Sequence, residues 1–184
     1  MIDEKNQALP QPGVSGAGDS VAEAATRTRV LQIIPTLDRA GAEKQFSLLC
    51  CHLPRSELDV HASALTLSGP YEQLRARHPV PLTVIGKRAK LDPFAFQQLR
   101  QLIKRLKPDV VQTWLFAANA YGRAAAASCH VPVIIGSEQC ADPWKRWHQL
   151  TIDRMLARRS ARIVANAEGV RDFYAGQGID AGRI

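Results

Sequence analysis

Residues 109–137 read DVVQTWLFAANAYGRAAAASCHVPVIIGS, and they decide the fold class of this chain. A short apolar run, DVVQTW, precedes an alanine-rich stretch, and a second apolar run, VPVIIGS, follows it. Short runs rich in Val and Ile are typical of strands buried on both faces. The stretch AANAYGRAAAAS at 117–128 has the composition of a helix. The segment therefore predicts a strand–helix–strand unit with parallel strands.

The same alternation continues over most of the chain. Further apolar runs predict strands at 29–35, 57–66, 81–86 and 161–167. Apolar periodicity or composition predicts helices at 41–53, 70–77, 92–106, 117–128, 142–158 and 168–178. Strands that alternate with helices in this way predict an α/β fold, a Rossmann-like three-layer sandwich with a mainly parallel sheet.

Two of these helices carry a signal for their first residue. Asp92 is a good N-cap, and Pro93 after it suits the first helical position. Pro108 follows the last apolar residue of that helix and predicts its end. Asp142 and Pro143 repeat the starting pattern, so they predict a helix that runs through about residue 158.

Composition excludes several classes of protein. The chain has 184 residues, of which 46% are hydrophobic, enough for one packed domain. Its formal net charge is +7, with 24 Lys and Arg against 17 Asp and Glu. Disordered chains combine low hydrophobicity with high net charge, and collagen-like or disulfide-stapled chains need far more Gly or Cys. No apolar stretch is long enough to predict a membrane-spanning helix.

Residues 1–28 are predicted to form a disordered N-terminal tail, and residues 29–184 the folded domain. The tail contains GVSGAGDS, which lacks the Gly-Lys-Ser/Thr ending of a phosphate-binding loop. It has neither the basic start nor the apolar run of a secretory signal. The four cysteines form no C-x-x-C pair and are expected to be reduced thiols, which favours a cytoplasmic protein.

Ligands of such folds bind outside the carboxyl ends of the strands, so the strand-to-helix turns are the places to search. In the first of them, Gly41 stands at the start of a helix, where backbone N–H groups and the helix dipole favour a phosphate. The alternative is a glycine required by a left-handed conformation or by close packing. Glu43 is then present because the dipole favours an acid in the first turn.

The turn after 109–114 contains aromatic and polar side chains together. Trp114 and Phe116 follow a buried strand and stand near Asn119, Tyr121 and Arg123. Aromatic rings with a few polar groups suit a sugar or a lipid-linked acceptor. The alternative for Trp114 and for Phe116 is that the ring fills the core.

The turn after 131–137 contains a carboxylate and two tryptophans. Glu138 stands where a general base or a hydroxyl-binding group could lie, and the alternative is a solvated loop residue. Trp144 and Trp147, with Lys145 and Arg146 between them, predict a patch for a membrane interface. The alternative is an amphipathic helix that buries one tryptophan.

Other chemistries receive little support. The five histidines show no metal-ligand spacing, so no metal is expected. Basic residues recur along the helices at 100–107 and 154–162, which fits solvated helix faces or an anionic membrane surface. They are interspersed with acidic residues and accompany no recognition motif, so no nucleic-acid partner is expected.

In their order and spacing, several segments resemble the N-terminal domain of family 4 glycosyltransferases, retaining enzymes whose fold is named GT-B. The resemblance covers about 29–184. The segments that carry it are RVLQIIPTLDRAGAEKQ, ALTLSGP, VIGKRAKLDPFAFQQLRQLIKRLKPDVVQTWLFAANAYGRAAA, VPVIIGSEQ, DPWKRWHQLTIDRMLARRSARIVANAEGVRDFY and GIDAGRI.

The resemblance implies roles for specific residues. It places Gly41, Ala42 and Glu43 in a loop near the donor's phosphates, although many relatives have a second glycine where Ala40 stands. It places Glu138 where relatives often carry a histidine near the reacting sugar. The residues that it implies for the acceptor cleft are Trp114, Phe116, Asn119 and Ser137.

The resemblance also implies an activity, the transfer of a sugar from a nucleotide-sugar to a glycan or lipid-linked acceptor in saccharide biosynthesis. The sequence contains no counterpart of the family's donor-binding domain with its E-x7-E motif. We therefore expect an acceptor-side half that is inactive alone, cytoplasmic or peripheral on the inner face of the membrane, with no cofactor besides its substrates. The alternative is a non-catalytic partner or acceptor-binding module of a split enzyme, working with a separate donor-domain chain.

Overall fold

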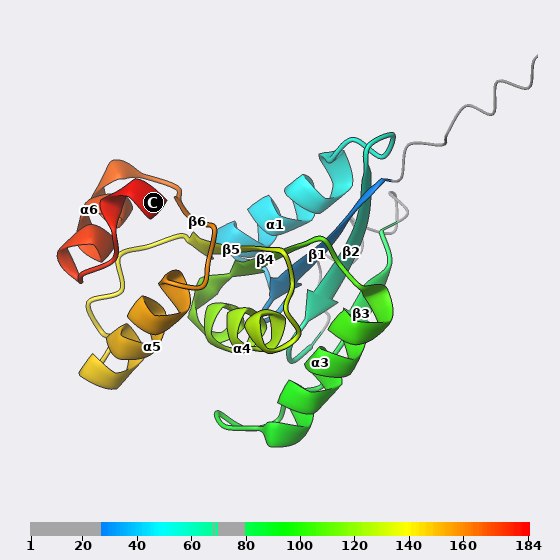
Figure 1. Cartoon of the computed structure of the whole chain (residues 1–184), viewed down its shortest axis with the longest axis horizontal. Helices are drawn as coiled ribbons and strands as arrows, with labels where there is room; N and C mark the ends of the chain where they lie inside the picture. The colour runs from blue at the N-terminus through cyan, green and yellow to red at the C-terminus, as the bar shows by residue number, and fades with distance from the viewer. Residues whose placement is uncertain (1–26, 68, 70–79) are drawn as a thin grey trace, which may run out of the picture.

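A computed structural model describes residues 27–67, 69 and 80–184 (Figure 1). Most of the predicted tail at 1–28 and the predicted helix at 70–77 lie outside these residues. The described strands are β1 (Thr28–Ile34), β2 (Leu58–Ala64), β3 (Leu82–Val84), β4 (Val110–Trp114), β5 (Val133–Glu138) and β6 (Arg162–Ala165). The helices are α1 (Gly41–His52), α3 (Pro93–Leu106), α4 (Leu115–Ser128), α5 (Trp147–Ala157), α6 (Glu168–Gly176) and the 3-10 turn η1 (Ala181–Arg183).

The strands form one six-stranded sheet in the order β3-β2-β1-β4-β5-β6, and every neighbouring pair is parallel. The predicted α/β class and parallel sheet are thereby confirmed. From β1 the chain proceeds to one edge through β2 and β3, and from β4 it proceeds to the other edge through β5 and β6. The strand order reverses between β1 and β4, which is where such sheets form a ligand crevice.

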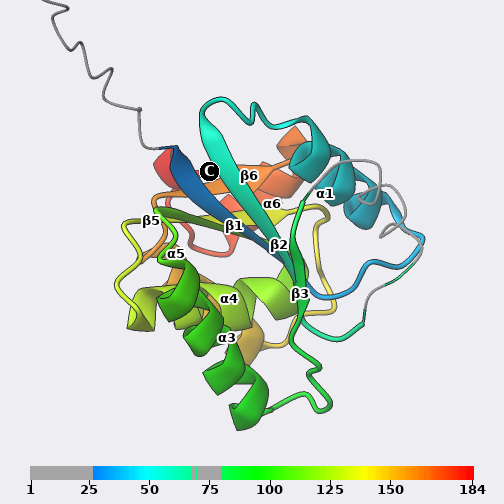
Figure 2. The ribbon, with the colours of Figure 1, turned by 90° about the vertical axis from the view of Figure 1, so that its right-hand side faces the viewer.

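Helices cover both faces of the sheet (Figures 1 and 2). On one face α1 packs over β1 and β2, and its Phe46 belongs to a core with Val30 and Ile34. On the opposite face lie α3, α4 and α5, where Leu31 and Ile33 of the same strand are buried. Because alternate residues of β1 enter different apolar cores, the strand is an almost continuous apolar run instead of an alternating pattern.

Helix α3 begins as the sequence predicts. The Asp92 carboxylate accepts a hydrogen bond from the Ala95 N–H at 3.0 Å, and Pro93 is the first helical residue. At the other end Lys107 adopts a left-handed conformation with φ of 47°. The residue before a proline is disfavoured from continuing a helix, so the chain leaves α3 there and enters β4.

Helix α4 lies close against the sheet because its inner face consists of small residues. Ala118, Ala125 and Ala126 are fully buried. A Cβ atom added to Gly122 would lie 2.5 Å from the Thr113 Cγ2 atom of β4, a distance at which something must shift. Gly122 therefore sets the separation of α4 from β4.

Helix α5 begins at Trp147, so the predicted start at Asp142 is wrong. Asp142 instead opens a tight turn in which its carbonyl accepts from the Lys145 N–H at 3.1 Å. The side chain of Gln149 then accepts from the Arg146 N–H at 2.8 Å, which caps the helix that follows. The Asp-Pro pattern marks a turn here because Lys145 points into the core instead of continuing a helical surface.

Candidate active site

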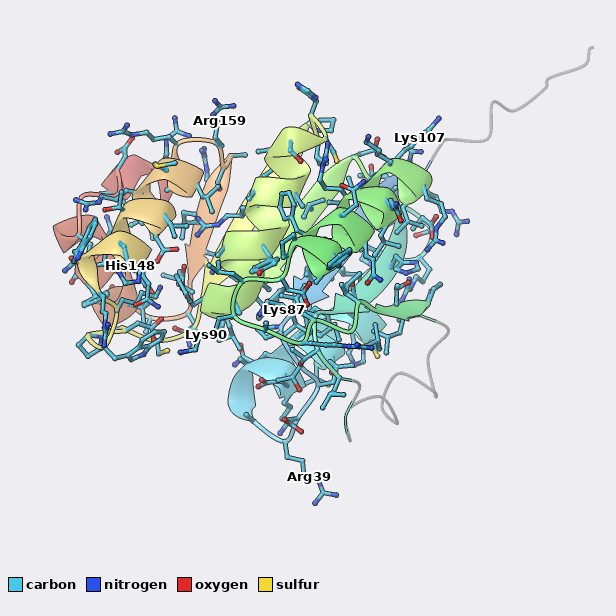
Figure 3. All side chains as sticks on the ribbon, turned by 90° about the horizontal axis from the view of Figure 1, so that it is seen from below. Arg39, Lys87, Lys90, Lys107, His148 and Arg159 are labelled. Carbon is cyan, nitrogen blue, oxygen red and sulfur yellow. The ribbon has the colours of Figure 1, made fainter. Side chains whose placement is uncertain are left out.

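The crevice of the sheet lies between the turns that follow β1 and β4. Leu115, the first residue of α4, occupies this position with φ of 64°, a conformation that costs free energy for a residue with a branched side chain. With the helices seen from the side, Arg39, Lys87 and Lys90 lie toward one end of the molecule, and Lys107 and Arg159 lie at the other (Figure 3).

The start of α1 offers unoccupied backbone donors to the crevice. No side chain caps this helix at Ala40. Among the described residues, nothing lies within 4 Å of a Cβ atom placed on Gly41, and only Gly86 and Gly178 are glycines with positive φ. The explanation of Gly41 by a left-handed conformation or by close packing is therefore wrong. The open approach and the positive end of the helix dipole suit an anionic group.

Glu43 is not the solvated first-turn acid that the helix dipole alone would explain. Its side chain is only 5% exposed, and its Oε2 atom has no hydrogen-bond partner among the described residues. A buried acceptor without a donor costs free energy. A hydroxyl group of a ligand would satisfy it, whereas a phosphate in direct contact would be repelled by an ionised carboxylate.

Trp114 fills the core, as one of the two interpretations of the sequence predicts. Its ring packs edge-to-face on Phe46, with centroids 5.9 Å apart. Phe116 is only half buried and packs edge-to-face on Trp144 at the same separation. Of the two rings expected to line an acceptor cleft, only Phe116 is partly open to a ligand.

A chain of side-chain hydrogen bonds runs across three strands beneath the crevice. The Trp114 indole donates to Gln32 Oε1 at 2.9 Å, and Gln32 Nε2 donates to Gln112 Oε1 at 2.9 Å. Gln112 Nε2 in turn donates to the Ser137 hydroxyl at 2.8 Å. These hydrogen bonds connect β1, β4 and β5 to one another through their side chains. Gln32 is a polar residue inside the apolar run RVLQIIP. It was the sequence signal for these hydrogen bonds, but it was not recognised.

Glu138 is buried at 2% exposure, so its interpretation as a solvated loop residue is wrong. Asn119 donates to its Oε1 atom at 2.8 Å, and the Tyr174 hydroxyl lies 3.0 Å from its Oε2 atom. The Asn119 amide also donates to the Ser137 carbonyl at 3.1 Å. The structure therefore brings Asn119, Ser137 and Glu138 together. All three are buried, and they hold the turn after β5 in place from inside the protein.

Two buried cations, Arg123 and Lys145, share the carboxylate of Asp153. Arg123 and Lys145 each approach Asp153 at 2.8 Å, through different oxygens of its carboxylate. Lys145 also lies 3.2 Å from Asp142 and 3.7 Å from Glu138. The network joins α4, β5, α5 and the loop between the last two. Asp153 could not be singled out from the sequence, because a lone acid on an amphipathic helix is usually solvated.

The Tyr174 hydroxyl connects Glu138, Asp142 and Lys145. Lys145 donates to the Tyr174 hydroxyl at 2.7 Å, and that hydroxyl has a single proton to donate. Tyr174 lies within hydrogen-bond distance of both Glu138 and Asp142, so only one of these carboxyls can accept from it. Tyr174 donates to one of them at a time, and Lys145 faces both carboxyls.

The electrostatics of the network favour the neutral form of Glu138. Burial raises the pKa of Glu138 above its ordinary value, although the nearby Lys145 acts in the opposite direction. With Glu138 neutral, two cations face two carboxylates in the interior, so the network is balanced in charge. Burial and the adjacent carboxyls also raise the pKa of Tyr174, which keeps its hydroxyl protonated.

The two tryptophans of the loop and α5 are both on the surface. Trp144 is 60% exposed and Trp147 is 78% exposed, so the alternative in which a helix buries one of them is wrong. Lys145, expected between them on the surface, is buried instead. Within residues 27–67, 69 and 80–184, no helix is long and apolar enough to cross a membrane. The same ranges contain no group of three His, Cys, Asp or Glu side chains that could hold a metal ion.

The fold is that of an N-terminal GT-B-type domain. The sequence profile of Glycosyltransferase Family 4 matches residues 39–184, most of the chain, and the chain therefore belongs to this family. No curated protein is significantly similar to it in sequence.

Solved structures share the fold at low sequence identity. HepE (Alr3699) of Anabaena in complex with UDP is 16% identical and superposes with a TM-score of 0.68 over 85% of this chain and 42% of its own. The lipopolysaccharide outer core galactosyltransferase WaaB is 14% identical, with a TM-score of 0.64 over 85% of this chain and 44% of its own. The UDP-GlcNAc 2-epimerase of Methanocaldococcus jannaschii is 16% identical, with a TM-score of 0.61 over 85% and 44%. The chain spans less than half the length of each.

Proposed function

We propose that this chain is the acceptor-side half of a retaining glycosyltransferase that uses a nucleotide-sugar and acts in glycan or lipid-linked saccharide biosynthesis. The observation that carries the proposal is the uncapped start of α1 at the switch point, with its open Gly41, in a chain that belongs to family 4. Two of the solved structures with this fold contain UDP, one of them together with glucose, which supports a nucleotide-sugar as the donor.

The first turn of α1 supplies two kinds of contact to such a donor. Backbone N–H groups of Gly41 and Ala42 face the negative phosphate groups, where the helix dipole adds to the attraction. Glu43 accepts a hydrogen bond from a sugar hydroxyl through its unpartnered Oε2 atom. Stabilisation of the diphosphate leaving group needs cationic groups from a second domain, so we expect this chain to be inactive alone.

The acceptor occupies the side of the crevice formed by the turns after β4 and β5. In this proposal Phe116 touches the acceptor, and Trp114, Asn119 and Ser137 hold the turns in place from beneath. Glu138 is a positioning residue, because its carboxyl group is enclosed by Asn119 and Tyr174. No metal takes part in the proposed transfer.

Epimerases with the same fold raise a second candidate function, because the M. jannaschii enzyme superposes nearly as well as the galactosyltransferase WaaB does. The family match favours transfer over epimerisation. If the chain takes part in glycosyl transfer, the alternative is a non-catalytic partner. Such a partner binds the acceptor and works with a separate donor-domain chain. In each case we propose a cytoplasmic chain, with the exposed Trp144 and Trp147 at the inner face of the membrane.

Binding of UDP-glucose to the purified chain, followed by ligand-observed NMR, tests the proposal. We expect weak binding that the variant Gly41→Gln reduces at least about tenfold, because the new side chain occupies the open approach to α1. Gly169 is the matched control, since it stands in the first turn of α6 and a Cβ atom there also meets nothing within 4 Å. Equal effects of Gly41→Gln and Gly169→Gln would contradict the proposed donor contact.

Turnover then separates the candidates. The chain alone, incubated with UDP-glucose or UDP-GlcNAc and a saccharide acceptor, is expected to form no product. Transfer that begins only when a donor domain is added supports the split-enzyme alternative. Appearance of the 2-epimer of the donor would favour the epimerase function instead.

A further inference from the structure

Most of the exposed large apolar side chains gather in one part of the molecule. Of the nine among the described residues, six come from the start of α3, from α5 or from the segment just before either helix. They are Leu91, Phe94, Trp144, Trp147, Ile152 and Met155. Isolated apolar residues on a surface are ordinary, but a cluster of this kind marks a binding surface.

Two of the six, Leu91 and Ile152, line an apolar hollow of about 320 Å³. Its lining residues come from α4, from α3 with the segment before it, and from α5. Figure 3 shows α4 lying between α3 and α5. The volume of the hollow is within the range of small-molecule sites. The residues that line it are Leu91, Asp92, Pro93, Phe96, Ala120, Tyr121, Ala124 and Ile152.

The one acid that lines the hollow is already engaged, so it adds no free acceptor there. The Asp92 carboxylate accepts from the N–H groups of Arg88 and Ala95, which lowers its pKa and keeps it ionised as the cap of α3. The Tyr121 hydroxyl donates to the Lys90 carbonyl at 2.9 Å and accepts from the Asp92 N–H. With its polar groups turned to the backbone, the hollow presents carbon to a ligand.

The loop at 86–91 lies at the rim of this hollow and carries three cations. Lys87 donates to the Ala89 carbonyl and lies over the Tyr121 ring. The side chains of Arg88 and Lys90 are exposed, and neither has a hydrogen-bond or ion-pair partner among the described residues. Two unpaired cations beside an apolar hollow complement a ligand with an anionic head and an apolar chain.

The loop at 86–91 also connects the hollow to the candidate active site. It follows β3 at the carboxyl edge of the sheet, where the Lys87 N–H donates to the Leu65 carbonyl at 2.7 Å. Lys87 and Lys90 lie at the same end of the molecule as Arg39, which directly precedes α1 (Figure 3). A head group held by Arg88 and Lys90 therefore lies at the edge that contains the crevice.

We propose that the hollow between α3, α4 and α5 binds the hydrocarbon chain of a phosphate-bearing lipid, with Arg88 and Lys90 at the phosphate. The inference rests on the proposed function, because it assigns the acceptor to the lipid-linked class. A lipid bound in this way places the group beyond its phosphate at the crevice. The exposed Trp144 and Trp147 then lie at the headgroup level of the bilayer from which the lipid comes.

Three soluble probes test the site on the full chain, each below its micelle concentration: octyl phosphate, octyl glucoside and inorganic phosphate. Amide NMR shifts of Ala120 and Ala124 report on the α4 side of the hollow. We expect octyl phosphate to shift both resonances and to bind at least about tenfold more tightly than either other probe. Equal binding of octyl phosphate and octyl glucoside would overturn the role of the cations.

Two matched pairs of variants locate the site. Ile152→Gln is expected to weaken octyl phosphate about tenfold, whereas Val164→Gln, at an exposed apolar position on β6, leaves it unchanged. Arg88→Gln with Lys90→Gln is expected to reduce octyl phosphate to the affinity of octyl glucoside. Arg158→Gln with Arg159→Gln, at the opposite end, is the control for net charge.

Unchanged binding of octyl phosphate to the Ile152→Gln variant would refute the lipid site. An equal loss of binding in the double variant of Arg88 and Lys90 and in that of Arg158 and Arg159 would refute it as well. Such a result leaves the proposed function intact, because UDP-glucose binding at Gly41 is measured separately and a saccharide acceptor needs no hydrocarbon chain. Loss of UDP-glucose binding with retained octyl phosphate binding would instead refute the proposed function alone.

Discussion

Different interactions attach the helices to the two halves of the sheet. Over β1 and β2, α1 is attached by an apolar core that includes Phe46, Ile34 and Val60. Beside β5, α4 and α5 are joined by buried charges, in which Arg123 and Lys145 share Asp153. Helix α1 buries five of its residues and α5 buries two, one of which is Asp153, so α5 depends on directional contacts.

The difference determines which substitutions each half of the sheet tolerates. Apolar contacts are non-directional, so a core accepts a similar volume in a somewhat different shape. A buried ion pair has little net effect on stability when complete, but removal of one partner leaves an uncompensated charge in the interior. The loop after β5, which borders the proposed acceptor side, therefore depends on a few side chains, whereas α1 depends on many.

The largest expected effect is on the charged half. Arg123→Met leaves Asp153 without its arginine and should lower the free energy of unfolding by roughly 3–5 kcal/mol, measured by urea denaturation. The double variant Arg123→Met with Asp153→Leu removes both charges and should lose much less than the sum of the single variants. Strict additivity of the two substitutions would show that the pair is not coupled.

The same measurement on the apolar half should give a smaller loss. Phe46→Leu keeps an apolar side chain of similar volume against Trp114 and is expected to cost about 1–1.5 kcal/mol. A loss as large as that of Arg123→Met would remove the contrast between the halves. Far-ultraviolet circular dichroism of both variants confirms that the comparison is made between folded proteins.

Replacement of Glu138 by Gln should have almost no effect at low pH, because an amide resembles the protonated acid. A raised native pKa means that the unfolded chain, with its ordinary value near 4.5, releases the proton first as the pH rises. The contribution of Glu138 to stability is therefore complete below that value and is lost as the pH rises through the native pKa.

Urea denaturation at several pH values checks this prediction. The wild type should become less stable relative to Glu138→Gln as the pH increases from about 4.5. The opposite slope would mean that Glu138 is ionised and stabilised by Lys145, and it would contradict a native pKa raised by burial.

The smallest effect concerns the reactivity of a thiol at the edge of the charged half. The hydrogen bond to Asp142, together with burial and the carboxylate's charge, raises the pKa of Cys140 to about 11. Asp142→Asn should lower that pKa and increase the rate of alkylation by iodoacetamide at pH 8 several-fold, measured by mass spectrometry. The buried Cys50 must stay unmodified in the same sample, because its modification would indicate general loosening instead.

The sequence by itself determined the class of the fold and most of its elements. Runs such as RVLQIIP and VPVIIGS could only be strands buried on two faces, and Asp92 with Pro93 fixed the start of α3, because these signals are local. Family membership followed from the order of the same segments. Gly41 could be proposed as a ligand contact, but whether its surroundings were open depended on everything packed around α1.

Only the tertiary structure decided the environment of the side chains. Glu138, Lys145 and Asp153 are charged residues that sequence patterns assign to the surface, and they are buried because each finds a partner from another element. Trp114 and Trp144 follow neighbouring strands and look alike in sequence, yet one fills the core and the other is exposed. Burial of a polar group depends on partners distant in sequence, and no local pattern contains them.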